Sequence, residues 1–253
     1  MDQQKIVLVT GGSRGLGKNM ALALAKKGND VIITYNSGKQ EAEQVVAEIE
    51  QMGQSAAALQ LNVGQVATFD GFAANLAEIL KEKWGRENFD FLVNNAGIGI
   101  NTPFESTTED QFDLLTNIHF KGVYFLIQKL LPTIANQGGI VNVSTGLTRF
   151  ALPGYSAYAA LKGAIEVLTK YLAKELGARG ITVNAVAPGA IETDFGGGVV
   201  RDNEQVNAFV ASNTALGRVG LPDDIGGVVA FLCSAEARWV NAQRIEVSGG
   251  MFI

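Results

Sequence analysis

The chain contains very little of the two residues that hold most structural metals. It has one histidine, His119, and one cysteine, Cys233, in 253 residues. A single cysteine forms no internal disulfide, and one histidine with one cysteine cannot supply the usual ligands of a zinc site or a cysteine-held cluster. Carboxylate sites for magnesium or calcium stay open. Because Cys233 lies in an apolar run, we expect it to be a small core residue. The chemistry of the protein must therefore come from other polar side chains or from a bound cofactor.

Net positive charge and long hydrophobic runs are also absent. There are 20 Lys plus Arg against 25 Asp plus Glu, a formal net charge of −5, which argues against a nucleic-acid partner. The apolar runs fall well short of the roughly 20 residues that span a bilayer. Met1 to Lys5 are polar, without the basic and apolar regions of a signal peptide. We therefore expect a cytoplasmic protein that binds neither nucleic acid nor membrane.

Short apolar runs alternate with helical patterns along most of the chain. Because several of these runs are apolar throughout, they are typical of buried parallel strands. Helical stretches such as Leu161 to Leu176 lie between them, with apolar residues on one face. This pattern predicts a single α/β domain over residues 1–253, a doubly wound seven-stranded parallel sheet flanked by helices on both faces. The predicted strands are residues 6–9, 31–33, 56–61, 91–93, 140–143, 181–186 and 245–247.

A glycine-rich segment follows the first predicted strand, in a chain that has 30 glycines. Its sequence is Thr10-Gly11-Gly12-Ser13-Arg14-Gly15-Leu16-Gly17, and a helical pattern begins at Lys18. Glycines at these positions let the backbone approach a pyrophosphate at a helix N-terminus, as in the Rossmann dinucleotide-binding fold. A triphosphate-binding loop is the alternative, since Gly12, Gly17 and Lys18 fit GxxxxGK. However, Asn19 stands where that loop needs Ser or Thr, which disfavours nucleotide triphosphate hydrolysis.

The end of the second predicted strand bears on the choice between NAD and NADP. Here the strand ends in Tyr35-Asn36-Ser37, and no carboxylate follows until Glu41. NAD sites normally have an acidic residue at this point to hold the ribose 2′-hydroxyl. Arg14 and Lys39 could instead face a 2′-phosphate. The sequence therefore favours NADP over NAD.

Tyr158 and Lys162 lie four residues apart at the start of a predicted helix, so both side chains lie on one face. A neighbouring ammonium group favours a phenolate, so the pair is a candidate proton donor and acceptor.

With these motifs in order, the chain resembles the single-domain short-chain dehydrogenase/reductase family. The resemblance is carried over essentially the whole chain by Thr10-Gly11-xxx-Gly15-x-Gly17, Asn94-Asn95-Ala96-Gly97, Asn117, Tyr158-xxx-Lys162 and Pro188-Gly189 leading to Thr193. The resemblance implies that Tyr158 is the general acid or base, that Lys162 lowers its pKa and binds the nicotinamide ribose, and that Asn117 holds a water for Lys162. It also places a hydroxyl residue thirteen positions before the tyrosine, at Thr145, where Ser is usual; Ser144 is the alternative.

The resemblance also implies which residues bind the cofactor. They are Gly11, Ser13, Arg14, Gly15, Leu16, Gly17, Tyr35, Asn36, Ser37, Asn62, Val63, Asn94, Ala96, Gly97, Tyr158, Lys162, Pro188, Gly189, Ile191 and Thr193. The Asn94-Asn95 pair is expected to have a structural role as well. His119, two residues after Asn117 on a helix, should face away from it, and we expect a helix-packing or subunit-contact residue.

A mobile substrate lid is expected over Asp194 to Gln205, with its three glycines, and it should become ordered when substrate binds. The pocket walls are expected to come from Leu147, Phe150, Leu152, Tyr155 and Phe195, which favours a moderately hydrophobic carbonyl compound. Within the family, the pattern is similar to bacterial 3-oxoacyl-(acyl carrier protein) reductases, so a 3-oxoacyl thioester is one candidate substrate. Two alternatives stay open: a non-catalytic NADP(H)-binding sensor or scaffold, and an NAD-dependent sugar, polyol or steroid dehydrogenase.

Family members usually form tetramers. The resemblance therefore implies a homotetramer through the predicted helices Phe112 to Ile127 and Tyr158 to Leu176 and the C-terminal Gln243 to Ile253.

Overall fold

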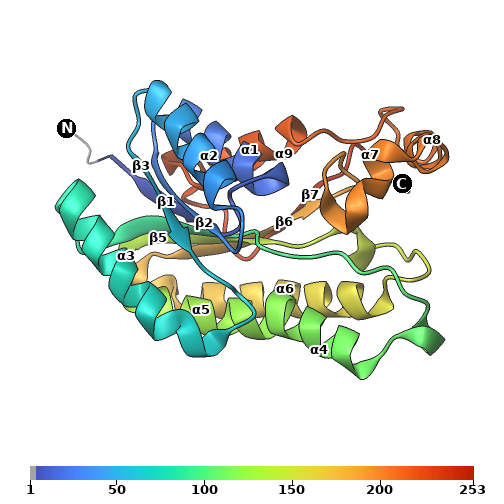
Figure 1. The fold of residues 1–253 in the computed structure, drawn as a ribbon, viewed down its shortest axis with the longest axis horizontal. Helices are drawn as coiled ribbons and strands as arrows, with labels where there is room; N and C mark the ends of the chain where they lie inside the picture. The colour runs from blue at the N-terminus through green and yellow to red at the C-terminus, as the bar shows by residue number, and fades with distance from the viewer. Residues whose placement is uncertain (1–3) are drawn as a thin grey trace.

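The protein is built around one parallel sheet (Figure 1). The computed structural model describes residues 4–253, so part of the polar N-terminal stretch considered above, residues 1–3, lies outside it. The sheet has the order β3-β2-β1-β4-β5-β6-β7, and every neighbouring pair is parallel. This confirms the predicted seven-stranded doubly wound fold. The strands are β1 (Ile6–Val9), β2 (Asp30–Tyr35), β3 (Ala56–Gln60), β4 (Phe89–Asn94), β5 (Ile134–Val143), β6 (Thr182–Pro188) and β7 (Arg244–Val247).

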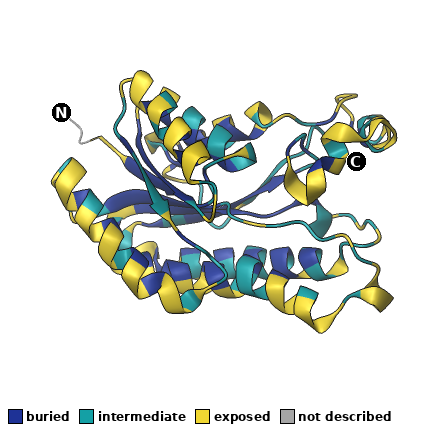
Figure 2. Ribbon diagram, in the orientation of Figure 1, coloured by how far each residue is buried: buried dark blue, intermediate teal, exposed yellow. Residues whose placement is uncertain are grey.

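Helices cover both faces of the sheet. α1 (Gly15–Lys26), α2 (Lys39–Gln51) and α9 (Asp223–Leu232) lie on one face. α3 (Phe69–Trp84), α4 (Glu109–Thr116), α5 (Gly122–Leu130) and α6 (Ser156–Glu175) lie on the other, while α7 (Val199–Asp202) and α8 (Glu204–Ser212) lie beyond one end of the sheet. The inner strands are buried, the edge strands β3 and β7 are mostly half-buried, and the outer helix faces are exposed (Figure 2). Cys233 is a buried core residue, as expected. Within residues 4–253, no helix is both long and apolar enough to cross a membrane.

The two halves of the sheet meet between β1 and β4. Residues after β1 lead into α1 on one face, and residues after β4 lead toward α4 on the other, so the chain diverges at this point. Ligands of such folds bind at this divergence, beyond the carboxyl ends of the strands. The segments after β1, β4, β5 and β6 therefore form the candidate site.

The predicted helix over Phe112 to Ile127 is not continuous. A π-helical turn, Asn117–Lys121, separates α4 from α5, and the backbone N–H of Gly122 donates to the carbonyl of Asn117. A π-helical turn holds one residue more than an α-helical turn, so it changes the direction of the side chains that follow it. π-Helical turns often occur at functional sites.

Candidate active site

The glycine-rich loop after β1 is shaped to admit an anion at the start of α1. Gly15 has φ +56°, and a Cβ there would meet only the Thr193 side chain, at 3.8 Å, so the loop faces the segment after β6. A Cβ on Gly17 would lie 2.1 Å from the Gly11 carbonyl oxygen, so only glycine allows the helix to start this close to the loop. The first turn of α1 has neither a side-chain cap nor an acidic residue. Its N–H groups and positive helix end therefore fit a pyrophosphate.

The side chains predicted to select NADP lie at the edge of this loop. Arg14 is exposed at the N-cap of α1, and within the described part of the chain its guanidinium group forms no ion pair. Lys39 is also exposed and pairs weakly with Glu43, at 3.7 Å on the same helix. Lys18, by contrast, pairs with Glu48 at 2.7 Å, as part of the packing of α1 on α2, rather than as the lysine of a triphosphate loop. The arrangement thus leaves Arg14 available to a 2′-phosphate.

The asparagine pair after β4 joins the strands at the divergence. The Asn95 amide donates to the carbonyls of Thr10 and Gly11 at 2.9 and 3.2 Å. The buried Asn94 amide donates to Asn142 at 2.9 Å, between β4 and β5. The Asn94 amide nitrogen therefore joins two strands of the sheet, as the expected structural role requires, while its Oδ1 is buried without a partner among the described residues. Its part in cofactor binding stays a prediction. The neighbouring Ala96 and Gly97 remain at the cleft surface.

The other predicted cofactor residues lie around the same edge of the sheet. Asn62 accepts the Gly64 N–H at 3.0 Å, which shapes the turn after β3. Ile191 and Thr193 are buried beyond β6, and Thr193 accepts the Phe195 N–H at 3.2 Å. Tyr35 at the end of β2, with Asn36 and Ser37 directly after it, extends the row on the side of the glycine loop. The remaining members lie within the segments already described: Gly11, Ser13 and Leu16 in the loop, Val63 after β3, and Pro188 and Gly189 at the end of β6.

Tyr158 and Lys162 are both buried on α6, at 7% and 5% exposure. Lys162 Nζ donates to the Val143 carbonyl at 2.6 Å and lies 5.8 Å from the centre of the Tyr158 ring. Burial lowers the pKa of Lys162 to about 8. Burial raises the pKa of Tyr158, although hydrogen bonding to Thr145 acts in the opposite direction. Desolvation of the phenolate is the largest cause of this rise, and the lowering of the Tyr158 pKa by Lys162 stays a prediction.

Ser144 and Thr145 follow β5 and point to different partners. The Ser144 hydroxyl is buried and donates to Glu166 at 2.6 Å. Thr145 contacts Tyr158, and its hydroxyl accepts the Leu147 N–H at 3.3 Å. Because neighbours on an extended strand point to opposite sides, only one of the two can lie in the site. The structure places Thr145 there.

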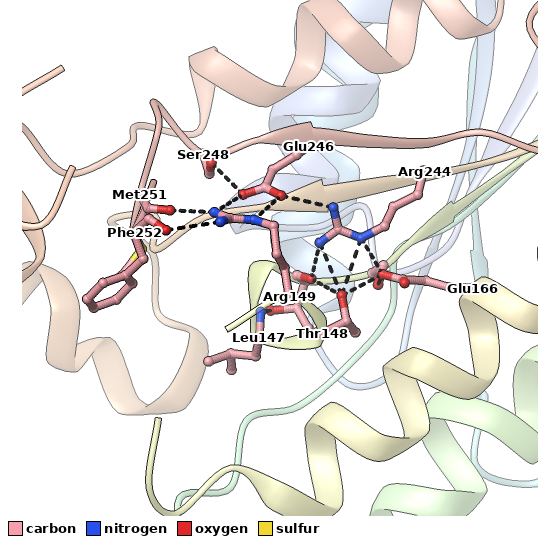
Figure 3. Close-up of polar contacts among 11 residues, drawn as sticks. Leu147, Thr148, Arg149, Glu166, Arg244, Glu246, Ser248, Met251 and Phe252 are labelled. Carbon is pink, nitrogen blue, oxygen red and sulfur yellow. Dashed lines mark hydrogen bonds and ion pairs between the residues drawn. The ribbon is translucent and has the colours of Figure 1, made fainter. Parts of the chain in front are cut away.

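A polar network that the sequence did not indicate holds the Thr145 segment against α6 and β7 (Figure 3). Glu166 Oε1 accepts from Ser144, Thr148 Oγ1 and Arg244 Nε, the last two at 2.7 Å. Arg244 also donates to the Thr145 carbonyl at 3.1 Å. Farther out, Arg149 and Arg244 share Glu246, and Arg149 reaches the carbonyls of Met251 and Phe252. The network ties the active-site hydroxyl to the C-terminal segment.

His119, in the π-helical turn between α4 and α5, lies against the proposed catalytic tyrosine. The His119 ring packs edge-on against Tyr158, with centroids 5.0 Å apart and an interplanar angle of 86°. Asn117 begins the turn and is partly exposed, and its carbonyl accepts the Gly122 N–H. The role expected of the Asn117 side chain stays a prediction. At 1% exposure His119 is enclosed within the chain, so it is not a subunit contact.

A cavity of about 540 Å³ opens beside the start of α6. Leu147, Leu152 and Tyr155 line it, as expected. Phe150 does not, because its ring packs against Phe252 at 4.8 Å in a separate apolar cluster. Phe195 stands over the Tyr158 ring at 5.8 Å. Further walls come from the residues around Leu152 and the first turn of α6, and from the segment after β4, whose part in the pocket had no sequence signal: Asn101, Pro103, Phe104 and Glu105.

Comparison with known proteins identifies relatives of this chain. The profile of the family described as enoyl-(acyl carrier protein) reductase matches residues 11–252. The chain is 38% identical over 255 residues to the 3-oxoacyl-[acyl-carrier-protein] reductase FabG of Staphylococcus aureus, with 100% of each sequence covered. Its fold is similar to that of the promiscuous reductase LugOII, which catalyses keto-reduction at C1 during lugdunomycin biosynthesis (TM-score 0.93, 37% identity, 98% of each chain). It is equally similar to the angucycline C-6 ketoreductase LanV with bound NADP (TM-score 0.93, 35% identity, 98% of this chain and 95% of LanV).

Proposed function

The chain belongs to the short-chain dehydrogenase/reductase family, and we propose that it is an NADP(H)-dependent oxidoreductase that reduces a carbonyl group to an alcohol, or catalyses the reverse. The observation that carries the proposal is the buried group of Tyr158, Lys162 and Thr145 beside a cavity and a glycine-rich loop. Relatives named as ketoreductases support the reaction class.

NADPH supplies the hydride when it is bound. The glycine loop and the N-terminus of α1 would hold its pyrophosphate, and Arg14 with Lys39 would face the 2′-phosphate. The neighbours with bound NADP or NADPH support this choice over NAD. Ala96, Gly97, Ile191 and Thr193 would line the nicotinamide half of the cleft.

Tyr158 would donate the proton that completes the reduction. Because burial raises the pKa of its phenol, Tyr158 stays protonated at neutral pH and can give its proton to the carbonyl oxygen as hydride reaches the carbon. The hydroxyl of Thr145, beside Tyr158, would orient that oxygen. Lys162, with a pKa of about 8, carries positive charge at neutral pH and would stabilise the phenolate that results.

The cavity supports a moderately hydrophobic carbonyl substrate, such as a 3-oxoacyl thioester or another ketone of that polarity. Its walls combine apolar side chains with only a few polar ones, Asn101 and Glu105 among them, and its size suits a small molecule. A free sugar would leave most of its hydroxyl groups without partners against such walls. A screen of ketones, 3-oxoacyl thioesters and alcohols with NADPH and NADH in parallel tests both substrate class and cofactor.

Replacement of Tyr158 by phenylalanine tests the mechanism. We expect NADPH binding to be retained and ketone reduction to fall by at least about 100-fold, because the proton donor is lost. Glu175→Gln, at an exposed position near the end of the same helix, is the control and should keep native rates. If the native protein binds NADPH but turns over no carbonyl compound, the sensor or scaffold alternative is correct.

Self-association as a homotetramer is part of this proposal. Six large apolar side chains are exposed on α4, α5 and α6, which supports a further copy of the chain as their partner: Phe112, Leu114, Tyr124, Phe125, Val167 and Tyr171. Sedimentation that shows only monomer at micromolar concentration would overturn it. A cytoplasmic location is proposed from composition, and fractionation against compartment markers tests it.

A further inference from the structure

His119 is the one histidine of the chain, and the mechanism above leaves it unused. It lies in the π-helical turn between α4 and α5, buried to 1% exposure, with its ring edge-on to Tyr158. The polar ring of His119 thus contacts the proposed proton donor of the reaction, so the binding partners of its two nitrogens matter for the site.

The hydrogen bonds of His119 define its tautomer. Nε2 lies 2.8 Å from the Ile98 carbonyl oxygen, and the Ile98 N–H approaches the same Nε2 as a donor at 3.4 Å. The two contacts compete, because the first needs hydrogen on Nε2 and the second needs a free lone pair there. A neutral imidazole carries one N–H, and the shorter contact assigns it to Nε2 as a donor to the carbonyl. Nδ1 is then an acceptor, and in residues 4–253 it is buried without a partner.

Nδ1 lies close to the candidate cofactor cleft. A Cβ on Gly97 would lie 3.3 Å from Nδ1 and 2.7 Å from the adjacent ring carbon, and Gly97 itself is exposed. The acceptor is therefore separated from the candidate cofactor cleft only by a residue without a side chain. Buried acceptors of this kind are normally paired with an ordered water or a ligand.

The charge of His119 fits an acceptor role. Burial, with the nearby positive charge of Lys162, lowers the pKa of His119 to about 3, so the ring is neutral at neutral pH. A neutral ring leaves the charge of Lys162 undisturbed and keeps the Nδ1 lone pair free. A water that donates to Nδ1 would satisfy this buried acceptor.

We propose that His119 is a polar positioning residue of this site: its ring holds Tyr158 edge-on, and its Nδ1 accepts a hydrogen bond from a buried water on the side of Gly97. The inference rests on the proposed oxidoreductase function and adds a positioning residue to it.

Two substitutions distinguish the role of the His119 Nδ1 atom from the role of its ring. His119→Asn keeps an acceptor at the δ position but removes the ring, whereas His119→Phe keeps the ring and removes both nitrogens. We expect kcat of the Phe variant to fall about 10- to 100-fold with the NADPH KM unchanged, and the Asn variant to keep most of the native kcat. Ile118→Val, on the same turn but facing Gly64, is the control.

The relative kcat values of the Phe and Asn variants decide the role of His119. A Phe variant as fast as native, or faster than the Asn variant, would show a packing role and overturn the proposal. If the Phe variant does not fold, His119→Ala provides the same comparison: added imidazole should restore kcat, whereas pyrrole, a flat ring without an acceptor nitrogen, should not. Equal rescue by both would overturn the proposal.

A measurement without turnover completes the test. Because His119 is the only histidine, ¹⁵N-histidine labelling of the untagged chain gives one pair of imidazole signals. We expect hydrogen on Nε2, a hydrogen-bonded acceptor at Nδ1 and no protonation between pH 5 and 8; hydrogen on Nδ1 would refute the assignment. If the native protein reduces no carbonyl compound, the proposed function fails, whereas an active native protein with an unaffected Phe variant refutes His119 alone.

Discussion

The network around Glu166 allows a quantitative prediction. One carboxylate oxygen accepts from Ser144 at 2.6 Å and from Thr148 and Arg244 at 2.7 Å, with side-chain exposures of 17% for Glu166 and 22% for Arg244. Hydrogen bonds to a charged group contribute about 1.5–3 kcal/mol each, against about 1 kcal/mol for neutral pairs. Glu166→Gln keeps the shape and an acceptor but removes the charge. Allowing for partial solvent screening, we expect a loss of about 2–3 kcal/mol of unfolding free energy.

For a chain of this size that loss lowers the Tm by about 4–12 °C. Because the network also holds the Thr145 carbonyl, we expect kcat to fall several-fold while the NADPH Kd stays native. Thermal unfolding by circular dichroism and steady-state kinetics measure the two effects. Glu175→Gln, an exposed glutamate on the same helix, is the matched control. If the two variants have the same Tm within about 1 °C, the network does not stabilise the site as argued.

Four further predictions follow from the site. Arg14→Ala should weaken NADPH binding about tenfold or more and leave NADH binding unchanged, measured by fluorescence titration; an equal loss for both cofactors would rule out 2′-phosphate recognition. Thr145→Ala should lower kcat about 100-fold with little change in Tm, whereas Ser144→Ala should mainly lower Tm; the reverse pattern would assign the site hydroxyl to Ser144. In the folded state His119 stays neutral to about pH 3, whereas in the unfolded state it binds a proton near pH 6.5. The free energy of unfolding should therefore decline as the pH falls from 6.5 to 3, and urea unfolding should show a shallower decline for His119→Phe. Proteolysis near Gly196 to Gly198, all at positive φ, should slow when cofactor and substrate are bound; equal cleavage rates would count against a lid.

Local pattern was sufficient for the fold and for part of the site. β1 is apolar along its length and β6 is apolar apart from Thr182 and Asn184, so the positions of both strands could be predicted within a few residues. The i, i+4 spacing of Tyr158 and Lys162 on one helix brought both into the site, because α6 is regular there. The Thr145 network could not be predicted, since Glu166 and Arg244 come together only when α6 packs beside β7.

The α4–α5 region shows why the rest was out of reach. On a regular helix, the position of a residue in a motif predicts whether its side chain faces the neighbouring helix. Asn117 is expected to face the site on that basis. A π-helical turn begins at Asn117 itself and redirects the side chains that follow. The direction of His119 was therefore decided by the contact with Tyr158 and the Ile98 carbonyl, residues distant along the chain.

By itself, the sequence determined the parallel sheet, the glycine loop after β1 and the Tyr158–Lys162 pair, because periodicity and spacing along one element are local properties. Only the tertiary structure decided that Thr145 and not Ser144 meets Tyr158, that His119 lies against Tyr158, and that burial raises the pKa of Tyr158. These outcomes depend on packing between elements that are far apart in the sequence. Packing excludes water from the polar groups and determines which hydrogen-bond partners they have.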